Sequence, residues 1–330
     1  MNQKIAIVGA GMAGLMVARS LTDCGHSVVV FEKARGPGGR MSTRRQEEYA
    51  FDHGAQYFTC RDQRFSDQVE VWREEGIVAE WASPIQVLRS GQLSTTQEQR
   101  ERYVGVPRMS SIARRLSQDL ELVTKTRVGE VIRDEKRGIP WEIRSESGDR
   151  LGHFDAVIVA TPAPQAVPLL AAVPDFAQIA SGVSMEPCHA TMVSFDSELE
   201  VDFGGAFVHD SILAWVARNS TKPNRPVAES WVLHSQSEWS AKQSEGNPEK
   251  VSAEMLQAFS EALGHPLPEV LFQSSHRWLL ARSEKPLGEG FLWNSASRLG
   301  VCGDWLHGDR VEGAFLSGLE LTEAIQQSLG

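Results

Sequence analysis

The sequence predicts an α/β protein with two parts, one built around a largely parallel sheet and the other around a mixed or antiparallel sheet. The N-terminus reads as strand, glycine turn, helix and strand, which is the pattern of a parallel βαβ unit. From about residue 180 to 282 the chain is rich in strand-like stretches that carry Trp, Val and Phe. The C-terminus returns to a strand followed by a helix. Because both ends share one pattern, we expect the first part to be discontinuous.

Length and composition agree with a globular protein. The 330 residues are 41% hydrophobic, enough to bury a sizeable core. The 33 Lys and Arg against 43 Asp and Glu give a net charge of −10. This charge repels nucleic acids and anionic membranes, so neither is an expected partner.

Cysteine usage and hydropathy indicate the compartment. The four cysteines are scattered without a CxxC pair, so neither a disulfide framework nor a metal site is expected. No apolar run has the ~18 residues of a spanning helix. Residues 5–17 are apolar, but they fit a mature fold better than a signal peptide. We therefore expect a soluble, cytoplasmic protein.

The N-terminal unit predicts a dinucleotide site. Gly9, Gly11 and Gly14 form GxGxxG between a strand over Lys4–Val8 and a helix over Met12–Asp23 that opens with Met12 and Ala13. Such glycines let backbone N–H groups approach a pyrophosphate at the helix N-terminus. Glu32 ends the next strand, where its carboxylate can accept hydrogen bonds from ribose hydroxyls. This unit predicts a Rossmann-like fold and leaves NAD and FAD both open.

The other elements follow in order. The glycine-rich stretches 35–45 and 51–58 are expected to be loops. Helices are expected over 64–75, 109–120, 248–263 and 313–328, and strands over 26–32, 123–134, 140–145, 154–160, 190–195, 212–218, 229–235, 270–280 and 299–302.

The segment after Glu32 distinguishes the two cofactors. It reads Glu32-Lys33-Ala34-Arg35-Gly36-Pro37-Gly38-Gly39-Arg40, and this pattern resembles the flavin amine oxidase superfamily. The resemblance implies FAD, with guanidinium groups adding positive charge beside the pyrophosphate. It places Lys33, Arg35, Gly39 and Arg40 at the cofactor.

Further segments resemble cofactor motifs of the same superfamily. Asp52 to Phe58 resembles the loop near the isoalloxazine, and Asp304 resembles the acid that binds a ribityl hydroxyl. The helix that begins near Gly313 would direct N–H groups to the flavin pyrimidine edge. The resemblance implies these additional cofactor contacts: Gly54, Ala55, Gln56, Tyr57, Phe58, Val128 as a backbone clamp on adenine, Thr161 and Ala314.

A closer resemblance concerns function. The loop FDHGAQYF and the segment Ala214 to Ser220 with Lys222-Pro223 look like bacterial renalase-like proteins. This resemblance implies a FAD oxidase that oxidises isomeric dihydronicotinamide dinucleotides to NAD(P)+ by hydride transfer to flavin N5, with oxygen as acceptor giving hydrogen peroxide. No cysteine occurs in a Ser-Gly-Gly-Cys-Tyr context, so the FAD is expected to be non-covalent.

The strand-rich part supplies the candidate catalytic residues. Hydride transfer needs a flat substrate pressed against the ring, and His234, Trp278 and Trp215 are the candidates that would line its pocket. A core position remains open for each of them. Lys285 is the nearest match, by order along the chain, to the lysine that flavin amine oxidases place near N5, but its setting looks like a turn.

We expect a FAD-binding domain over 1–80, 104–175 and 283–330, and a substrate domain over 81–103 and 176–282. Two other functions remain open, a flavin-containing amine oxidase and a catalytically silent flavin-bound interaction protein. The expected partners are the small-molecule substrate and oxygen, with no obligate protein partner indicated.

Overall fold

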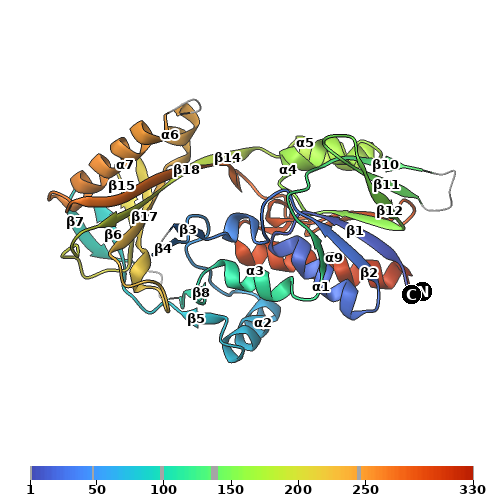
Figure 1. The fold of residues 1–330 in the computed structure, drawn as a ribbon, viewed down its shortest axis with the longest axis horizontal. Helices are drawn as coiled ribbons and strands as arrows, with labels where there is room; N and C mark the ends of the chain where they lie inside the picture. The colour runs from blue at the N-terminus through green and yellow to red at the C-terminus, as the bar shows by residue number, and fades with distance from the viewer. Residues whose placement is uncertain (1, 47, 97–99, 135–139, 244–246, 330) are drawn as a thin grey trace.

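The first part of the molecule is a six-stranded sheet covered on both faces (Figure 1). The computed structural model describes residues 2–46, 48–96, 100–134, 140–243 and 247–329. The strand order is β19-β20-β13-β1-β2-β9, and only β19 runs antiparallel to its neighbour. Its strands are β1 (Lys4–Val8), β2 (Ser27–Phe31), β9 (Glu121–Val123), β13 (Ala156–Val159), β19 (Leu292–Asn294) and β20 (Leu299–Val301).

Alternating side chains of β1 enter two separate cores. Ile5 and Ile7 pack in the core that contains α1 (Met12–Asp23) and α9 (Val311–Leu329). Ala6 and Val8 pack in the core that contains the three-stranded sheet β10 (Val128–Arg133), β11 (Trp141–Ser145) and β12 (Arg150–Phe154). Strands buried on both faces explain the continuous apolar runs in the sequence.

The second part is a seven-stranded mixed sheet of order β18-β14-β17-β16-β15-β6-β7. Its strands are β6 (Ile85–Arg89), β7 (Gln92–Thr95), β14 (Met185–Phe195), β15 (Gly205–His209), β16 (Leu213–Arg218), β17 (Ser230–Ser235) and β18 (Val270–Ser283). The long strands β14 and β18 extend from this sheet toward the first part (Figure 1). Helix α7 (Pro248–Leu263) covers one face, where Trp231 and Leu233 of β17 join its core. His234, next along β17, therefore lies on the opposite face, which is turned to the first part.

Smaller elements complete the chain. They are η1 (Gly39–Met41), β3 (Arg44–Gln46), β4 (Tyr49–Phe51), α2 (Gln63–Glu74), β5 (Val78–Glu80), β8 (Tyr103–Gly105), α3 (Ser110–Leu116), α4 (Ala163–Ala166), η3 (Val167–Leu170), α5 (Pro174–Ser181), η4 (Asn219–Thr221), α6 (Ser237–Lys242) and α8 (Asp304–His307). Among the described helices, none combines the length and apolar character needed to cross a membrane.

This architecture confirms the predicted fold class, an α/β protein with a Rossmann-like part and a mixed-sheet part. Two predicted strands are wrong in detail. The strand expected over 154–160 is interrupted at Asp155, whose carboxylate accepts the Lys4 N–H as the chain passes from one sheet to the other. The strand expected over 123–134 is interrupted by a turn at Lys125, whose φ is +54°.

The helix expected over 109–120 is shorter than predicted, because α3 ends at Leu116 and Asp119 has a φ of +60°. The predicted domain boundaries remain predictions.

Candidate functional site

The glycine turn after β1 has the shape of an anion site. Gly11 caps α1 without any side-chain hydrogen bond to the helix, and no acidic residue lies in the first turn. A Cβ built on Gly11 meets nothing within 4 Å, so the backbone there faces open space. Gly14, by contrast, packs so closely on Ala160 that a Cβ would lie 2.9 Å from that side chain. Uncapped N–H groups at a helix N-terminus fit a pyrophosphate.

Glu32 is buried at the end of β2 and already oriented. Its carboxylate accepts the Ala10 N–H at 2.9 Å on one oxygen and the Ala34 N–H at 2.7 Å on the other. Each carboxylate oxygen can accept a further hydrogen bond, so the group can still receive ribose hydroxyls. Lys33 instead donates to Gln165 at 3.0 Å, and Arg35 is exposed.

Arg40 and Asp304 are 264 residues apart in the sequence and form an ion pair in the structure. The two guanidinium nitrogens lie 2.8 and 2.6 Å from the two carboxylate oxygens, and Arg40 also donates to the Ala281 carbonyl at 3.0 Å. The sequence predicted one residue at the pyrophosphate and the other at the ribityl chain. Their bidentate pair brings the first and last cofactor segments together.

The remaining predicted cofactor residues lie in α9, in β10 and in the turn after β13. Gly313 and Ala314 lie in the first turn of α9, beside a cavity of about 280 Å³ that Asp309, Arg310 and Gly313 help to line. Val128 is buried at the start of β10. The Thr161 hydroxyl oxygen is buried and has no hydrogen-bond partner among the described residues. An open turn, an oriented acid and an orphaned hydroxyl fit a bound dinucleotide.

The loop from Asp52 to Phe58 is pressed against Arg40. Ala55 donates its N–H to the Arg40 carbonyl at 2.9 Å, and a Cβ on Gly54 would overlap that same carbonyl. Only glycine allows this approach. Phe58 is buried against Phe65 and Tyr103.

A fully buried ion cluster lies behind the loop. Arg225 donates twice to one Asp52 oxygen, at 2.6 and 3.1 Å, while the other oxygen accepts the Thr43 hydroxyl and the Met109 N–H. The Lys222 ammonium lies 3.6 Å from Asp52 and donates to the Gln56 amide oxygen at 3.1 Å. The side chains of Asp52, Lys222 and Arg225 are all 0% exposed.

These charges change the acidities within the cluster. Burial alone would raise the pKa of Asp52, but the adjacent Lys222 and Arg225 hold it below its ordinary value. Burial lowers the pKa of Lys222 to about 8, against the opposing effect of Asp52.

Four aromatic side chains gather where β17 and β18 face the loop. His234 and the Trp278 indole N–H both contact the His53 carbonyl oxygen, at 3.1 and 2.9 Å. The His53 ring stacks on Trp278 with centroids 5.1 Å apart, and His276 meets Trp278 edge-on at 4.5 Å. Burial lowers the pKa of both His53 and His234 to about 4, so both rings are neutral near pH 7.

Trp215 is the cross-strand partner of His234 between β16 and β17, and its ring belongs to a second aromatic group. Trp215 is 7% exposed and packs between Tyr57, Trp81 and Phe207. Its indole nitrogen has no partner among the described residues. Lys285 lies in an exposed bend after β18. A larger groove of about 830 Å³ beside α7 is lined by none of the predicted site residues.

Sequence reasoning placed Asp52 in the flavin-like loop and Lys222 in the renalase-like segment, but assigned no individual role to Asp52, Lys222 or Arg225. Two signals were present, the acid that begins the flavin-like loop and the Lys-Pro dipeptide in the renalase-like segment. Neither signal predicts that residues about 170 positions apart form one buried cluster.

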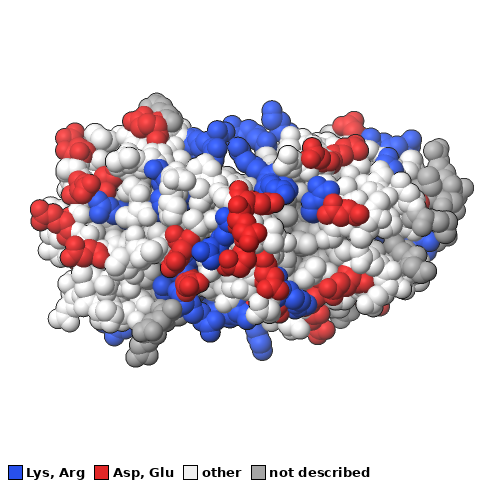
Figure 2. Space-filling model, turned by 90° about the horizontal axis from the view of Figure 1, so that it is seen from below, with Lys and Arg blue, Asp and Glu red and all other residues white. Residues whose placement is uncertain are grey.

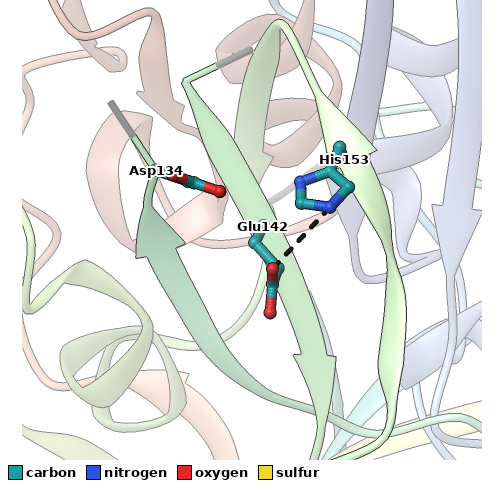
Figure 3. A group of neighbouring side chains, drawn as sticks. All are labelled: Asp134, Glu142 and His153. Carbon is teal, nitrogen blue, oxygen red and sulfur yellow. Dashed lines mark ion pairs between the residues drawn. The ribbon is translucent and has the colours of Figure 1, made fainter. Parts of the chain in front are cut away.

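One group of potential metal ligands occurs among the described residues. Asp134, Glu142 and His153 lie together on the three-stranded sheet, with all three ligand atoms within 4.8 Å of one another (Figure 3). The Glu142 carboxylate already forms ion pairs with Arg144 at 2.6 Å and with Arg150 at 3.3 Å. Two cations on the same carboxylate oppose the binding of a divalent ion.

Comparisons with known proteins identify the family. A family model described as an NAD(P)-binding Rossmann-like domain matches residues 7–70. The model of the flavin containing amine oxidoreductases matches residues 90–326, more than half of the chain. The chain belongs to the flavin-containing amine oxidoreductase family. Its cofactor class is therefore flavin.

Two solved structures share the fold of this chain. A candidate protoporphyrinogen oxidase from Exiguobacterium sp. 255-15 superposes with a TM-score of 0.78 at 12% identity, covering 99% of both chains. Cyclohexylamine oxidase from Brevibacterium oxydans superposes with a TM-score of 0.74 at 13% identity, covering 100% of both chains. At this identity the likeness shows the fold alone.

The similarity to curated sequences is local. The 4,4'-diapophytoene desaturase of Staphylococcus aureus (strain Newman) is 33% identical over 78 residues, which is 21% of this chain and 16% of the desaturase. The family membership therefore fixes the cofactor class and leaves the substrate to be argued from the site.

Proposed function

We propose that this flavin oxidoreductase is a renalase-like FAD oxidase of isomeric dihydronicotinamide dinucleotides. The dihydronicotinamide would lose a hydride to the bound FAD, and oxygen would then take up two electrons and two protons, one from the hydride and one from solvent, so that NAD(P)+ and hydrogen peroxide are the products. The chain would bind FAD non-covalently. In support, burial raises the pKa of the Cys302 thiol, the cysteine nearest Asp304 in sequence, and thereby disfavours the reactive thiolate.

The charge of the candidate site is the observation that carries this proposal. The chain has a net charge of −10, and the face on the α2 side has Asp and Glu at its centre between two groups of Lys and Arg (Figure 2). Inside, Asp52 is a single carboxylate bonded to Arg225 and close to Lys222. Arg44 adds positive charge near His53 and His276. Such a site attracts an anionic dinucleotide and disfavours a protonated amine.

The aromatic side chains at the site suit a substrate whose reacting ring is flat and uncharged. Trp278 and His53 offer aromatic faces, and His234 and His53 are neutral near pH 7. The His53 Nδ1 atom is buried and has no partner among the described residues. A neutral imidazole nitrogen can exchange a hydrogen bond with a carboxamide. The chain's own contribution is to hold the substrate ring face-on and to keep water out.

Anaerobic mixing tests the proposal. The FAD-loaded protein would be mixed with the 2- and 6-dihydro isomers of NAD, and separately with benzylamine, putrescine and cyclohexylamine. We expect rapid loss of the flavin absorbance with the dihydronicotinamides, followed by one hydrogen peroxide per turnover when oxygen is admitted. Amines that bleach the flavin at comparable rates would overturn the proposal.

A flavin-containing amine oxidase is the second candidate, because Tyr57, Trp81 and Trp215 form an aromatic group of the kind that cages amines. A flavin that no compound of either class reduces would instead indicate a catalytically silent interaction protein. The cytoplasmic location, the absence of nucleic acid and membrane partners and the role of oxygen remain predictions.

A further inference from the structure

The buried cluster of Asp52, Lys222 and Arg225 contains two cations for one carboxylate. Asp52 is bonded to Arg225 through two N–H groups, and its other oxygen accepts two neutral donors. This pair is already balanced. Lys222 therefore brings a second buried positive charge, and its clearest hydrogen bond goes to the neutral Gln56 amide at 3.1 Å.

The surroundings of Lys222 offer little compensation for the positive charge of its ammonium group. Its ammonium lies 5.4 Å from the centre of the Trp81 ring, and the ion-pair distance to Asp52 is 3.6 Å. Two further groups of the described chain add no negative charge here, because Arg108 interacts electrostatically with Arg225 and His234, which Lys222 influences, is uncharged near pH 7. A buried charge without a full partner is costly, unless an anion forms close to it.

The loop connects this charge to the dinucleotide site. A Cβ on Gly39 would lie 3.6 Å from Gly11, so the two glycine segments adjoin at the N-terminus of α1. The next residue, Arg40, holds Asp304 through its side chain and Ala55 through its carbonyl. Gln56 follows directly and touches Lys222. A dinucleotide anchored at Gly11 and extending past Arg40 and Asp304 must bring its far half to this loop.

We propose that Lys222 supplies the buried positive charge that stabilises the reduced, anionic form of the flavin, and that Gln56 fixes its position. The inference rests on FAD being the cofactor, as proposed above. It concerns the equilibrium between oxidised and reduced flavin and does not depend on which substrate donates the hydride. The burial that lowers the pKa of Lys222 to about 8 still leaves it mainly charged near pH 7.

The decisive variant is Lys222→Gln, because the amide can still donate a hydrogen bond to Gln56 but carries no charge. We expect the two-electron midpoint potential of the bound flavin to fall by at least 30 mV, which corresponds to about a tenfold change in the equilibrium constant. The potential would be measured at pH 7 by equilibration with a redox dye during slow reduction. Lys222→Arg should keep a potential near that of the unchanged protein.

Controls separate charge from position. Lys285→Gln removes an exposed lysine after β18 and should leave the potential unchanged. The affinity of Lys222→Gln for oxidised FAD and its thermal midpoint should stay close to those of the unchanged protein. If Lys222→Gln does not fold, Lys222→Met, which fills the same space without a polar amide, takes its place.

An unchanged potential in either folded, flavin-loaded neutral variant overturns the inference, and so does an equal loss of potential in Lys222→Arg. A protein that binds no FAD overturns the inference and the proposed function together. FAD that binds but is not reduced by dihydronicotinamides contradicts the proposed function alone, because the potentials of the variants still decide the role of Lys222.

Discussion

Two ion clusters hold the cofactor segments of this protein together, and they differ in burial and in charge balance. Arg40 and Asp304 form a one-to-one pair whose side chains are 29% and 8% exposed. Asp52, Lys222 and Arg225 are 0% exposed and contain two cations for one acid. Removing one member of a buried cluster leaves a charge that water cannot reach. The two clusters should therefore respond very differently to the same kind of substitution.

The largest expected effect is on Arg225. Arg225→Met leaves the buried Asp52 carboxylate with two neutral donors and only the more distant Lys222 as a cation in this cluster, and we expect it to lower the free energy of unfolding by about 3 to 5 kcal/mol. Urea denaturation measures this change. Arg73→Met is the matched control, since Arg73 pairs with Glu70 on the exposed face of α2 and its removal should change the free energy of unfolding very little. A similar small cost for both variants would contradict the assigned role of burial.

Acid should reveal the burial of two histidines beside the second cluster. His53 and His234 have pKa values lowered to about 4, whereas an unfolded histidine titrates near 6.5. Between these values the unfolded chain binds more protons than the folded one, so stability falls as the pH falls. The loss at pH 5 is about 2 kcal/mol for each ring.

The check is the free energy of unfolding from pH 7.5 to 4.5. His234→Gln retains an N–H donor for the His53 carbonyl but cannot titrate, so its pH profile should be flatter by about half. A profile as steep as that of the unchanged protein would remove His234 from this account.

The Arg40–Asp304 pair, whose guanidinium is still reached by water, should show a smaller effect on folding and a separate effect on FAD binding. Asp304→Asn should change the stability of the flavin-free protein by less than about 1 kcal/mol. If Asp304 also accepts a ribityl hydroxyl, the FAD dissociation constant should rise about tenfold, as for the loss of one charge-assisted hydrogen bond. Titration followed by flavin fluorescence measures the constant. An unchanged affinity would limit Asp304 to pairing with Arg40.

The sequence predicted the surroundings of the Arg40–Asp304 pair better than those of the cluster formed by Asp52, Lys222 and Arg225. The strand Lys4–Val8, the helix Met12–Asp23 and the helix Pro248–Leu263 match the structure because each rests on local signals of turn, cap and periodicity. Arg40 and Asp304 were both assigned to the cofactor, although their direct pairing was not foreseen.

The second cluster depends on packing between distant segments. Alternation along β17 correctly indicated that His234 and Leu233 face opposite sides. Nothing in the sequence showed that His53, Trp278 and His234 meet at one carbonyl, because that contact depends on how β18 and the loop approach each other. Burial of Lys222 and Arg225 likewise depends on this packing, since both residue types are mostly exposed in proteins.

An equally small effect on stability is expected at Trp278, where it separates a pocket role from a core role. Trp278 is only partly buried, and its indole N–H shares the His53 carbonyl with His234. Trp278→Phe keeps an aromatic ring against His53 but removes this N–H donor, and the carbonyl retains its second partner. We expect a loss of stability of about 1 kcal/mol or less. Because a smaller ring covers less of a flat substrate, anaerobic flavin reduction should slow severalfold with little change in FAD affinity.

Trp231→Phe is the control, since Trp231 is 0% exposed in the core under α7 and should lose stability at an unchanged reduction rate. If Trp278→Phe behaves like this control, Trp278 belongs to the core and the substrate must bind against other residues.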